Sequence, residues 1–256
     1  MRLYLAGVES HVDMCKRVKP PYVLMSYAGL QKNKNLESKL EYVMSEDCKD
    51  WLLDSGAFTY FNNGQEKTIA EWERYIDGLT EVVNATKCKH FFELDIDRIV
   101  GLEQVEKFRE RIERRTGKQC IPVWHSNRGF DYFKRMCAEY DYVSIGGIAK
   151  NPNGKKIAKL FPYFIDYAHK TGTKIHGLGY TDFKGLSKLD FDSVDSTTWL
   201  VGAQYCEVFE VGPYGLKRVP IKQDGKKGDG KKLTEYCMQT FTQYSKMIDN
   251  RKERWD

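Results

Sequence analysis

The 256-residue sequence lacks the features that mark membrane-bound and secreted proteins. It holds no run of 18 apolar residues, so no membrane-spanning helix is expected, and no apolar N-terminal run resembles a signal peptide. Its seven cysteines form no Cys-x-x-Cys or Cys-x-Cys pair, which favours free thiols in a reducing compartment. We therefore expect a cytoplasmic protein that has no contact with a membrane.

A Pro/Gly/Ser-rich linker is also absent, and this length suits one large domain. We predict a main domain over residues 1–210, with a basic loop and a C-terminal helix over 211–256 packed on it. The net charge of +5 permits an anionic partner such as nucleic acid without requiring one. In residues 217–232, seven Lys or Arg accompany two Asp. A loop of this composition is either solvated or in contact with phosphates, and the candidates for such contacts are Lys226, Lys227, Lys231 and Lys232.

Short β-rich runs recur along the chain, and most are almost continuously apolar, as expected for parallel strands covered on both faces. We predict strands at residues 2–7, 22–27, 51–58, 90–97, 120–126, 142–148, 174–180 and 195–201. Helical patterns occupy residues 68–83, 102–117, 130–140, 155–172 and 232–255. This alternation predicts an α/β fold, a (β/α)8 TIM barrel, with a doubly wound open sheet as the alternative. No Gly-x-Gly-x-x-Gly follows the first strand, which disfavours a dinucleotide-binding version of that alternative.

Polar residues and glycines gather where the predicted strands end, which is where a barrel of this type carries its chemistry. Those strand ends hold Asp54 and Ser55, then Asp95 and Asp97, then His125, then Gly146 and Gly147, then His176 and Gly177, with Asp190, Asp192 and Asp195 at the last. Carboxylates that converge at this end of the barrel, its mouth, shift one another's pKa. One can then act as a nucleophile while another holds a proton. Glycosyl transfer through a covalent intermediate needs such a division of roles. No His-x-His or His-Glu-x-x-His pattern occurs, so neither a metal nor another cofactor is predicted.

Each of these residues also has a structural explanation. An Asp after a strand is often the N-cap of the next helix, which suits Asp97 better than Asp54. His125 could be a hydrogen-bonded core histidine. Gly146-Gly147 could form a simple turn, although glycine also lets a flat nucleobase lie against the backbone. Nearby aromatic residues could stack on a base or pack in the core; these are Trp124, Tyr180 and Trp199.

Five motifs occur in order along residues 50–200: LLDSGAF, FFELDID, the Gly-Gly of SIGGIA, HGLG and FDSVDSTTW. This order resembles the tRNA-guanine transglycosylase (queuine tRNA-ribosyltransferase) superfamily, whose TIM barrel exchanges guanine for a 7-deazaguanine base. The resemblance implies that Asp195 is the nucleophile and that Asp54 assists proton transfer beside the sugar. It implies that Asp95 reads the edge of the base.

The same resemblance makes Gly146-Gly147 the lining of the base pocket. His125 falls where the family has a glutamine contacting the base, and His176 falls where an apolar residue stacks on it. We therefore count both histidines, together with Ser55 and Gly177, among the substrate-binding candidates.

The sequence departs from the tRNA enzymes in two ways. After the last strand it offers only Cys206 and Cys237, without the family's Cys-x-Cys-x-x-Cys…His zinc cluster, and it lacks their RNA-binding additions. In both respects it is similar to the phage-type DNA 7-deazaguanine transglycosylases (the DpdA family). The resemblance implies exchange of guanine in DNA for a free 7-deazaguanine base, in the host cytoplasm if a phage encodes the chain. The alternatives are a tRNA enzyme, a nucleoside or glycoside hydrolase, and a nucleic-acid-binding protein without turnover.

Overall fold

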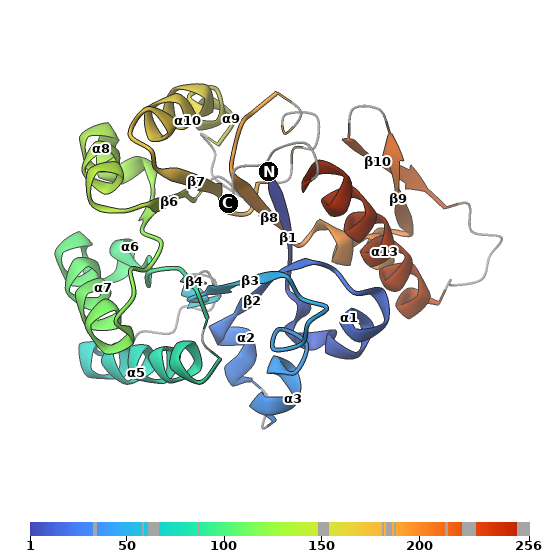
Figure 1. Cartoon of the computed structure of the whole chain (residues 1–256), viewed down its shortest axis with the longest axis horizontal. Helices are drawn as coiled ribbons and strands as arrows, with labels where there is room; N and C mark the ends of the chain where they lie inside the picture. The colour runs from blue at the N-terminus through green and yellow to red at the C-terminus, as the bar shows by residue number, and fades with distance from the viewer. Residues whose placement is uncertain are drawn as a thin grey trace.

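The computed structural model describes residues 1–32, 35–57, 59–60, 67–86, 88–147, 154–180, 182, 186, 188–212, 215–221 and 229–249. They form an α/β fold around a curled sheet of eight parallel strands (Figure 1). The strands are β1 (Arg2–Ala6), β2 (Tyr22–Ser26), β3 (Asp50–Asp54), β4 (His90–Phe91), β5 (Val123–Trp124), β6 (Tyr142–Ile145), β7 (Lys174–Gly177) and β8 (Ser193–Ser196).

The strand order is β4-β3-β2-β1-β8-β7-β6-β5. In a doubly wound sheet of order 3-2-1-4-5-6, β4 lies beside β1, but here β8 pairs with β1, and β4 and β5 are the two edge strands. The segments that adjoin the two edge strands also meet. Phe92 and Ile121 form a parallel bridge, in which Ile121 N–H donates to the Phe91 carbonyl (2.7 Å) and Glu93 N–H donates to the Ile121 carbonyl (3.1 Å). This topology is compatible with a TIM-like barrel and not with the doubly wound alternative.

Side chains along the strands alternate between two cores, because successive residues of a strand point to opposite faces. In β1, Leu3 and Leu5 lie in the large core between sheet and helices, whereas Tyr4 and Ala6 lie in a smaller cluster on the other face. The smaller cluster draws on both halves of the sheet; its members are Tyr4, Ala6, Tyr22, Leu24, Leu52, Phe92, Ile121, Val123 and Tyr142. The sheet therefore curls around this inner cluster.

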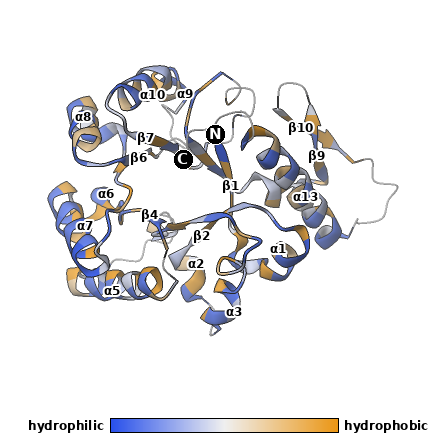
Figure 2. Ribbon diagram, in the orientation of Figure 1, coloured by the Kyte–Doolittle hydropathy of each residue, from blue (hydrophilic) through white to orange (hydrophobic). Residues whose placement is uncertain are grey.

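Helices surround the sheet, and Figure 2 shows polar and apolar residues on each of the longer ones. They are α1 (Val12–Val18), α2 (Tyr27–Gln31), α3 (Leu36–Leu40), α5 (Ile69–Thr86), α6 (Asp97–Val100), α7 (Leu102–Thr116), α8 (Gly129–Glu139), α9 (Gly154–Ala158), α10 (Phe161–Lys170), α12 (Val201–Tyr205) and α13 (Gly230–Asp249), with 3-10 turns η1 (Val8–Ser10), η2 (Ser126–Arg128) and η3 (Thr198–Leu200). In α7 the apolar residues Val105, Phe108 and Ile112 are buried, and Gly117 ends the helix at a φ of 67°, a left-handed conformation that glycine adopts without strain. No described helix is long and apolar enough to cross a membrane.

Two sequence predictions need correction. The last strand was predicted at 195–201, but β8 ends at Ser196, and the apolar run after it forms η3 and α12. Trp199 is buried in that turn by folding back on the first strand, where its Nε1–H donates to the Ala6 carbonyl (2.9 Å). The sequence reading also missed an antiparallel hairpin, β9 (Glu207–Gly212) and β10 (Gly215–Pro220).

The predicted boundary after residue 210 falls inside β9. The C-terminal helix α13 lies beside β1 in Figure 1, and Ser245 Oγ donates to the Leu3 carbonyl (2.9 Å). Tyr22 also donates from its hydroxyl to Asp249 Oδ2 (2.5 Å). The end of the described chain is thus tied to its first two strands.

Candidate functional site

Asp195 lies in β8, and one of its carboxylate oxygens is held firmly. Oδ1 accepts hydrogen bonds from Gly179 N–H (2.6 Å) and from His176 Nε2 (3.1 Å). No hydrogen bond from a described residue reaches Oδ2, and the side chain keeps 8% of its surface exposed. The carboxylate is therefore oriented with one oxygen engaged and the other available.

Asp54 ends β3 and is electrostatically coupled to two other acids of the mouth. Burial and the neighbouring carboxylates Asp95 and Asp195 raise the pKa of Asp54 to about 8, although Gly56 N–H donates to its Oδ2 (3.1 Å). The raised pKa keeps a proton on Asp54 at neutral pH. Carboxyl groups from β3, β8 and the end of the β4 segment therefore come together, as predicted from the strand ends.

Asp95 is oriented by His125, which lies between two carboxylates. His125 Nε2 is 3.1 Å from Asp95 Oδ2, and its Nδ1 is 3.3 Å from Asp97 Oδ1. Burial lowers the pKa of His125, but the hydrogen bonds to Asp95 and Asp97 outweigh burial and raise it to about 9. A protonated imidazole therefore offsets the charge of the acid cluster at neutral pH.

Behind His125 lies a buried ion network that the sequence reading did not find. Arg128 donates to Glu93 Oε1 (2.6 Å) and to Asp97 Oδ1 (3.0 Å), and Arg109 lies 3.3 Å from Glu93 Oε2. Burial alone would raise the pKa of Asp97, but the bonds from His125 and Arg128 hold it well below its usual range. Asp97 is the first residue of α6 and its side chain does not cap that helix, so the N-cap explanation is wrong.

Gly146 and Gly147 pack closely against His125. A Cβ on Gly146 would lie 2.7 Å from Val123 Cγ1 and 2.9 Å from His125 Nε2, and Gly147 has a φ of 70°. Any side chain at Gly146 would displace the imidazole, so glycine is required next to the Asp95–His125 pair.

Three predicted substrate contacts are buried. His176 is fully buried and bonds Ser193 and Asp195, so its ring is not presented to a stacked base. The hydroxyl of Ser55 is buried, and Gly177 packs against Val194, where a Cβ would lie 3.2 Å from Cγ1. The aromatic candidates Trp124, Tyr180 and Trp199 are also buried in the core.

Asp192, another acid of the same motif as Asp195, stabilises the scaffold. Its Oδ2 accepts from Ile175 N–H (2.8 Å) and lies 3.0 Å from His169 Nε2. These two contacts of Oδ2 connect β7 and α10 to the segment before β8. Asp195 is therefore the acid of this motif that is directed to the mouth.

Glu9 is a further acid that the sequence reading missed. It follows β1 in η1, its Oε2 is buried without a hydrogen-bond partner among the described residues, and burial raises its pKa. Its charge also contributes to the raised pKa of Asp54. The signal was available, because Glu9 comes directly after the first strand, at the edge where the other acids lie.

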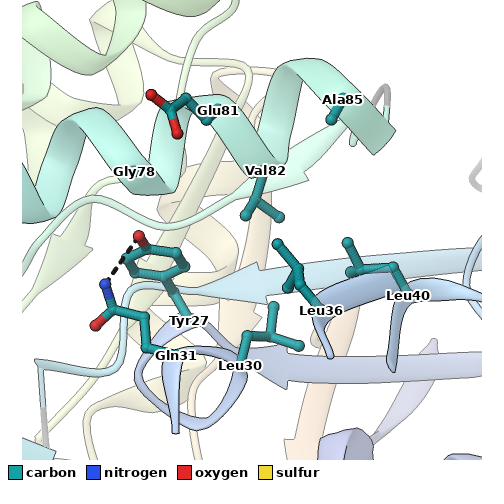
Figure 3. A pocket seen from close by; sticks show the side chains of 9 residues that line it. All are labelled: Tyr27, Leu30, Gln31, Leu36, Leu40, Gly78, Glu81, Val82 and Ala85. Atoms are coloured by element: carbon teal, nitrogen blue, oxygen red, sulfur yellow. Dashed lines mark hydrogen bonds between the residues drawn. The ribbon is translucent and has the colours of Figure 1, made fainter. Parts of the chain in front are cut away.

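Two hollows lie outside the acid cluster. A polar cleft of about 820 Å³ adjoins Glu9 between α1, α3 and the start of α13, and Lys231 is among its lining residues. An apolar groove of about 310 Å³ lies between α2, α3 and α5, as Figure 3 shows, and none of the predicted site residues lines it. Lys232 is exposed beside Asp229, whereas Lys226 and Lys227 lie outside the described residues.

Across the described ranges, no group of three or more His, Cys, Asp or Glu side chains is arranged to hold a metal. No protein-family model matches this chain, and no curated protein matches it. The family resemblance therefore rests on the five motifs and on their positions at the strand ends.

Proposed function

We propose that this protein is a base-exchanging DNA-guanine transglycosylase, in which the curled sheet closes through the Phe92–Ile121 bridge into a (β/α)8 barrel. One observation carries the proposal. Asp195 has one oxygen that no described residue hydrogen-bonds, and its charge acts on Asp54, whose pKa of about 8 keeps it protonated at neutral pH. An oriented aspartate and a second carboxyl group that holds a proton meet the need of double displacement for a nucleophile and an acid.

In the first half of the reaction, a guanine is flipped out of DNA into the mouth. Asp195 Oδ2 attacks C1′, the bond from C1′ to guanine N9 breaks, and Asp54 gives its proton to the departing base. The product is an ester between Asp195 and the sugar. Since Asp195 Oδ1 already accepts two hydrogen bonds, Oδ2 is the oxygen placed to form that ester.

In the second half, a free 7-deazaguanine enters, with the 7-cyano form as the proposed base. Asp54, now ionised, removes the proton from N9 as N9 attacks C1′, and Asp195 leaves as a carboxylate. Asp95 would accept hydrogen bonds from the guanine-like edge that both bases share, while His125 holds its other oxygen. Each turnover returns both acids to their starting protonation states.

The test is incubation of the protein with guanine-containing DNA and labelled guanine. Exchange of label into DNA is expected for the wild type. In Asp195→Ala the exchange rate should fall by many orders of magnitude, because no other group can form the ester. Asp192→Asn is the matched control, since that acid anchors Ile175 and is not directed to the mouth. Release of base without exchange would indicate a hydrolase, and neither exchange nor release would indicate a binding protein.

A further inference from the structure

We propose that His176 is a positioning residue for Asp195 and the centre of a hydrogen-bond relay through the sheet interior, formed by Tyr142, Ser193, His176 and Asp195. The geometry of the relay is independent of the reaction. Its effect on turnover rests on the proposed transglycosylation.

The relay is continuous and buried. Tyr142 hydroxyl contacts Ser193 Oγ, Ser193 Oγ lies 2.5 Å from His176 Nδ1, and His176 Nε2 lies 3.1 Å from Asp195 Oδ1. His176 and Ser193 have no exposed surface. Three aromatic rings surround the imidazole, with centroids 5.2 Å (Phe92), 6.3 Å (Tyr4) and 6.4 Å (Tyr142) away.

Counting donors gives the relay one direction. Asp195 Oδ1 can only accept, so an imidazole with one proton carries it on Nε2 and accepts at Nδ1. Ser193 has a single hydroxyl proton, which it donates to His176 Nδ1. Ser193 Oγ then accepts from the hydroxyl of Tyr142.

This direction decides which oxygen of Asp195 reacts. With Nε2–H and Gly179 N–H both on Oδ1, rotation of the carboxylate would break two hydrogen bonds. Oδ2 therefore stays directed to the substrate. Holding a nucleophile in this way matters because a displacement of about 1 Å can cost on the order of 10²-fold in rate.

The proton position can be measured without any activity. In protein labelled with ¹⁵N-histidine, the His176 signals should show the proton on Nε2, assigned by their loss in His176→Asn. Ser193→Ala should change these signals and leave those of His169 in place. A proton on Nδ1 of His176 would overturn the relay.

Kinetics test its consequence. A glutamine at 176 places its amide nitrogen near the position of Nε2, whereas an asparagine reaches only the position of Nδ1 beside Ser193. His176→Asn should lower kcat roughly 10²-fold, with the KM for the free base within about threefold, and His176→Gln should restore most of the loss. His169→Gln, a histidine bonded to an aspartate outside the site, should retain wild-type turnover.

Wild-type kcat in His176→Asn would overturn the positioning role. Absence of exchange in the wild type would instead overturn the proposed function, while the proton position on His176 would still test the relay.

Discussion

At the scale of single residues, the environment gives chemically identical carboxyl groups different roles. Asp195 has two donors on one oxygen, whereas Asp54 has one backbone donor and three acidic neighbours, Asp95, Asp195 and Glu9. Burial and like charge both favour the protonated form of Asp54. Asp97 does not compete for that proton, because the hydrogen bonds from His125 and Arg128 hold its pKa well below the usual range.

We predict that Asp54→Asn lowers exchange by about 10²–10⁴-fold, the usual contribution of a positioned acid or base. Because the wild type needs a proton on Asp54, its base-release rate should fall as pH rises through about 8, and Asp54→Asn should lack that limb. The measurement is single-turnover release of labelled guanine between pH 6 and 9.5. If the release rate of Asp54→Asn still falls through the same pH range, a group other than Asp54 is the acid.

A thermal measurement provides the folding control for this variant. Between roughly pH 4 and pH 8 the unfolded chain gives up the Asp54 proton while the folded chain retains it, so stability falls as pH rises through this window. Asp54→Asn should remove that loss and raise Tm at pH 8.5 by several degrees, because each kcal/mol of unfolding free energy shifts Tm by about 2–4 °C in a chain of this size. Its Tm gain at pH 5 should be smaller.

Gly146 allows a second prediction at this scale. Gly146→Ala would force a Cβ against Val123 and His125, and overpacking of this kind costs about 1–3 kcal/mol of unfolding free energy. The rate of base exchange should fall as well, because a displaced His125 would no longer orient Asp95. Denaturant melts and exchange rates measure the two effects. Gly212→Ala, whose nearest neighbour would be 3.4 Å away, is the control, and equal behaviour of the two variants would contradict the close packing.

Sequence alone could place the acids but not their partners. Asp54, Asp95 and Asp195 were identified because they follow apolar runs, and the carboxyl ends of parallel strands meet at one edge. The roles of His176 and Ser193 depend on which face of a four-residue strand each side chain occupies, and such short strands carry too few residues to show an alternation. The Arg128–Glu93 pair joins residues 35 positions apart, which no local pattern reveals.

At the scale of elements, long amphipathic helices were predictable and short pieces were not. The helices α5, α7 and α8 follow the three- and four-residue spacing of their apolar residues. The predicted strand at 90–97 is reduced to two residues plus a bridge, since Glu93 turns into the buried ion network. The β9–β10 hairpin was hidden because charged residues interrupt both strands, although Gly212 and Gly215 mark its turn.

The packing of α13 gives an element-scale prediction. Phe241 is fully buried and stacks edge-on against Phe209 of the hairpin, with ring centroids 5.0 Å apart. Phe241→Ala should lower the free energy of unfolding by about 3–5 kcal/mol. The exposed Gln243 on the same helix provides the control, and Gln243→Ala should stay within about 0.5 kcal/mol of the wild type. Equal denaturation midpoints for the two variants would show that α13 does not stabilise the sheet.

At the scale of the whole molecule, the positive charge is unevenly distributed with respect to the acid cluster. The mouth itself gathers carboxylates, which repel phosphates, so binding of a nucleic acid needs cations around it. Lys231 lines the polar cleft that adjoins Glu9, and Lys232 follows it, with its ammonium nitrogen 3.9 Å from Asp229 Oδ2. An exposed pair at this distance contributes little, which leaves the lysine free to meet a phosphate.

We predict that DNA is the acceptor polymer. Recognition of a folded RNA uses shape, loops and 2′-hydroxyl groups over a wide surface, whereas a flipped base in DNA needs a basic rim and a pocket. Beyond the sheet and its helices, the described residues add only the small β9–β10 hairpin and α13. Offered equal amounts of tRNA and guanine-containing DNA with labelled 7-cyano-7-deazaguanine, the protein should label the DNA. Label in tRNA alone would refute the choice of polymer and leave the exchange chemistry intact.

The role of the lysines follows from the salt dependence of the same binding. Each phosphate contact to duplex DNA contributes about 0.9 to the slope of log K against log salt, so Lys231→Ser with Lys232→Ser should flatten that slope by about 1–2. The control is Arg114→Ser with Lys170→Ser, which removes the same charge from the C-terminal ends of α7 and α10. These helix ends precede the N-terminal ends of β5 and β7, away from the strand ends that carry the acids. This control should keep the wild-type slope, and the accepted base should be unchanged in both variants. If both pairs flatten the slope equally, the effect is one of net charge, and the cleft beside Glu9 is not the path of the DNA.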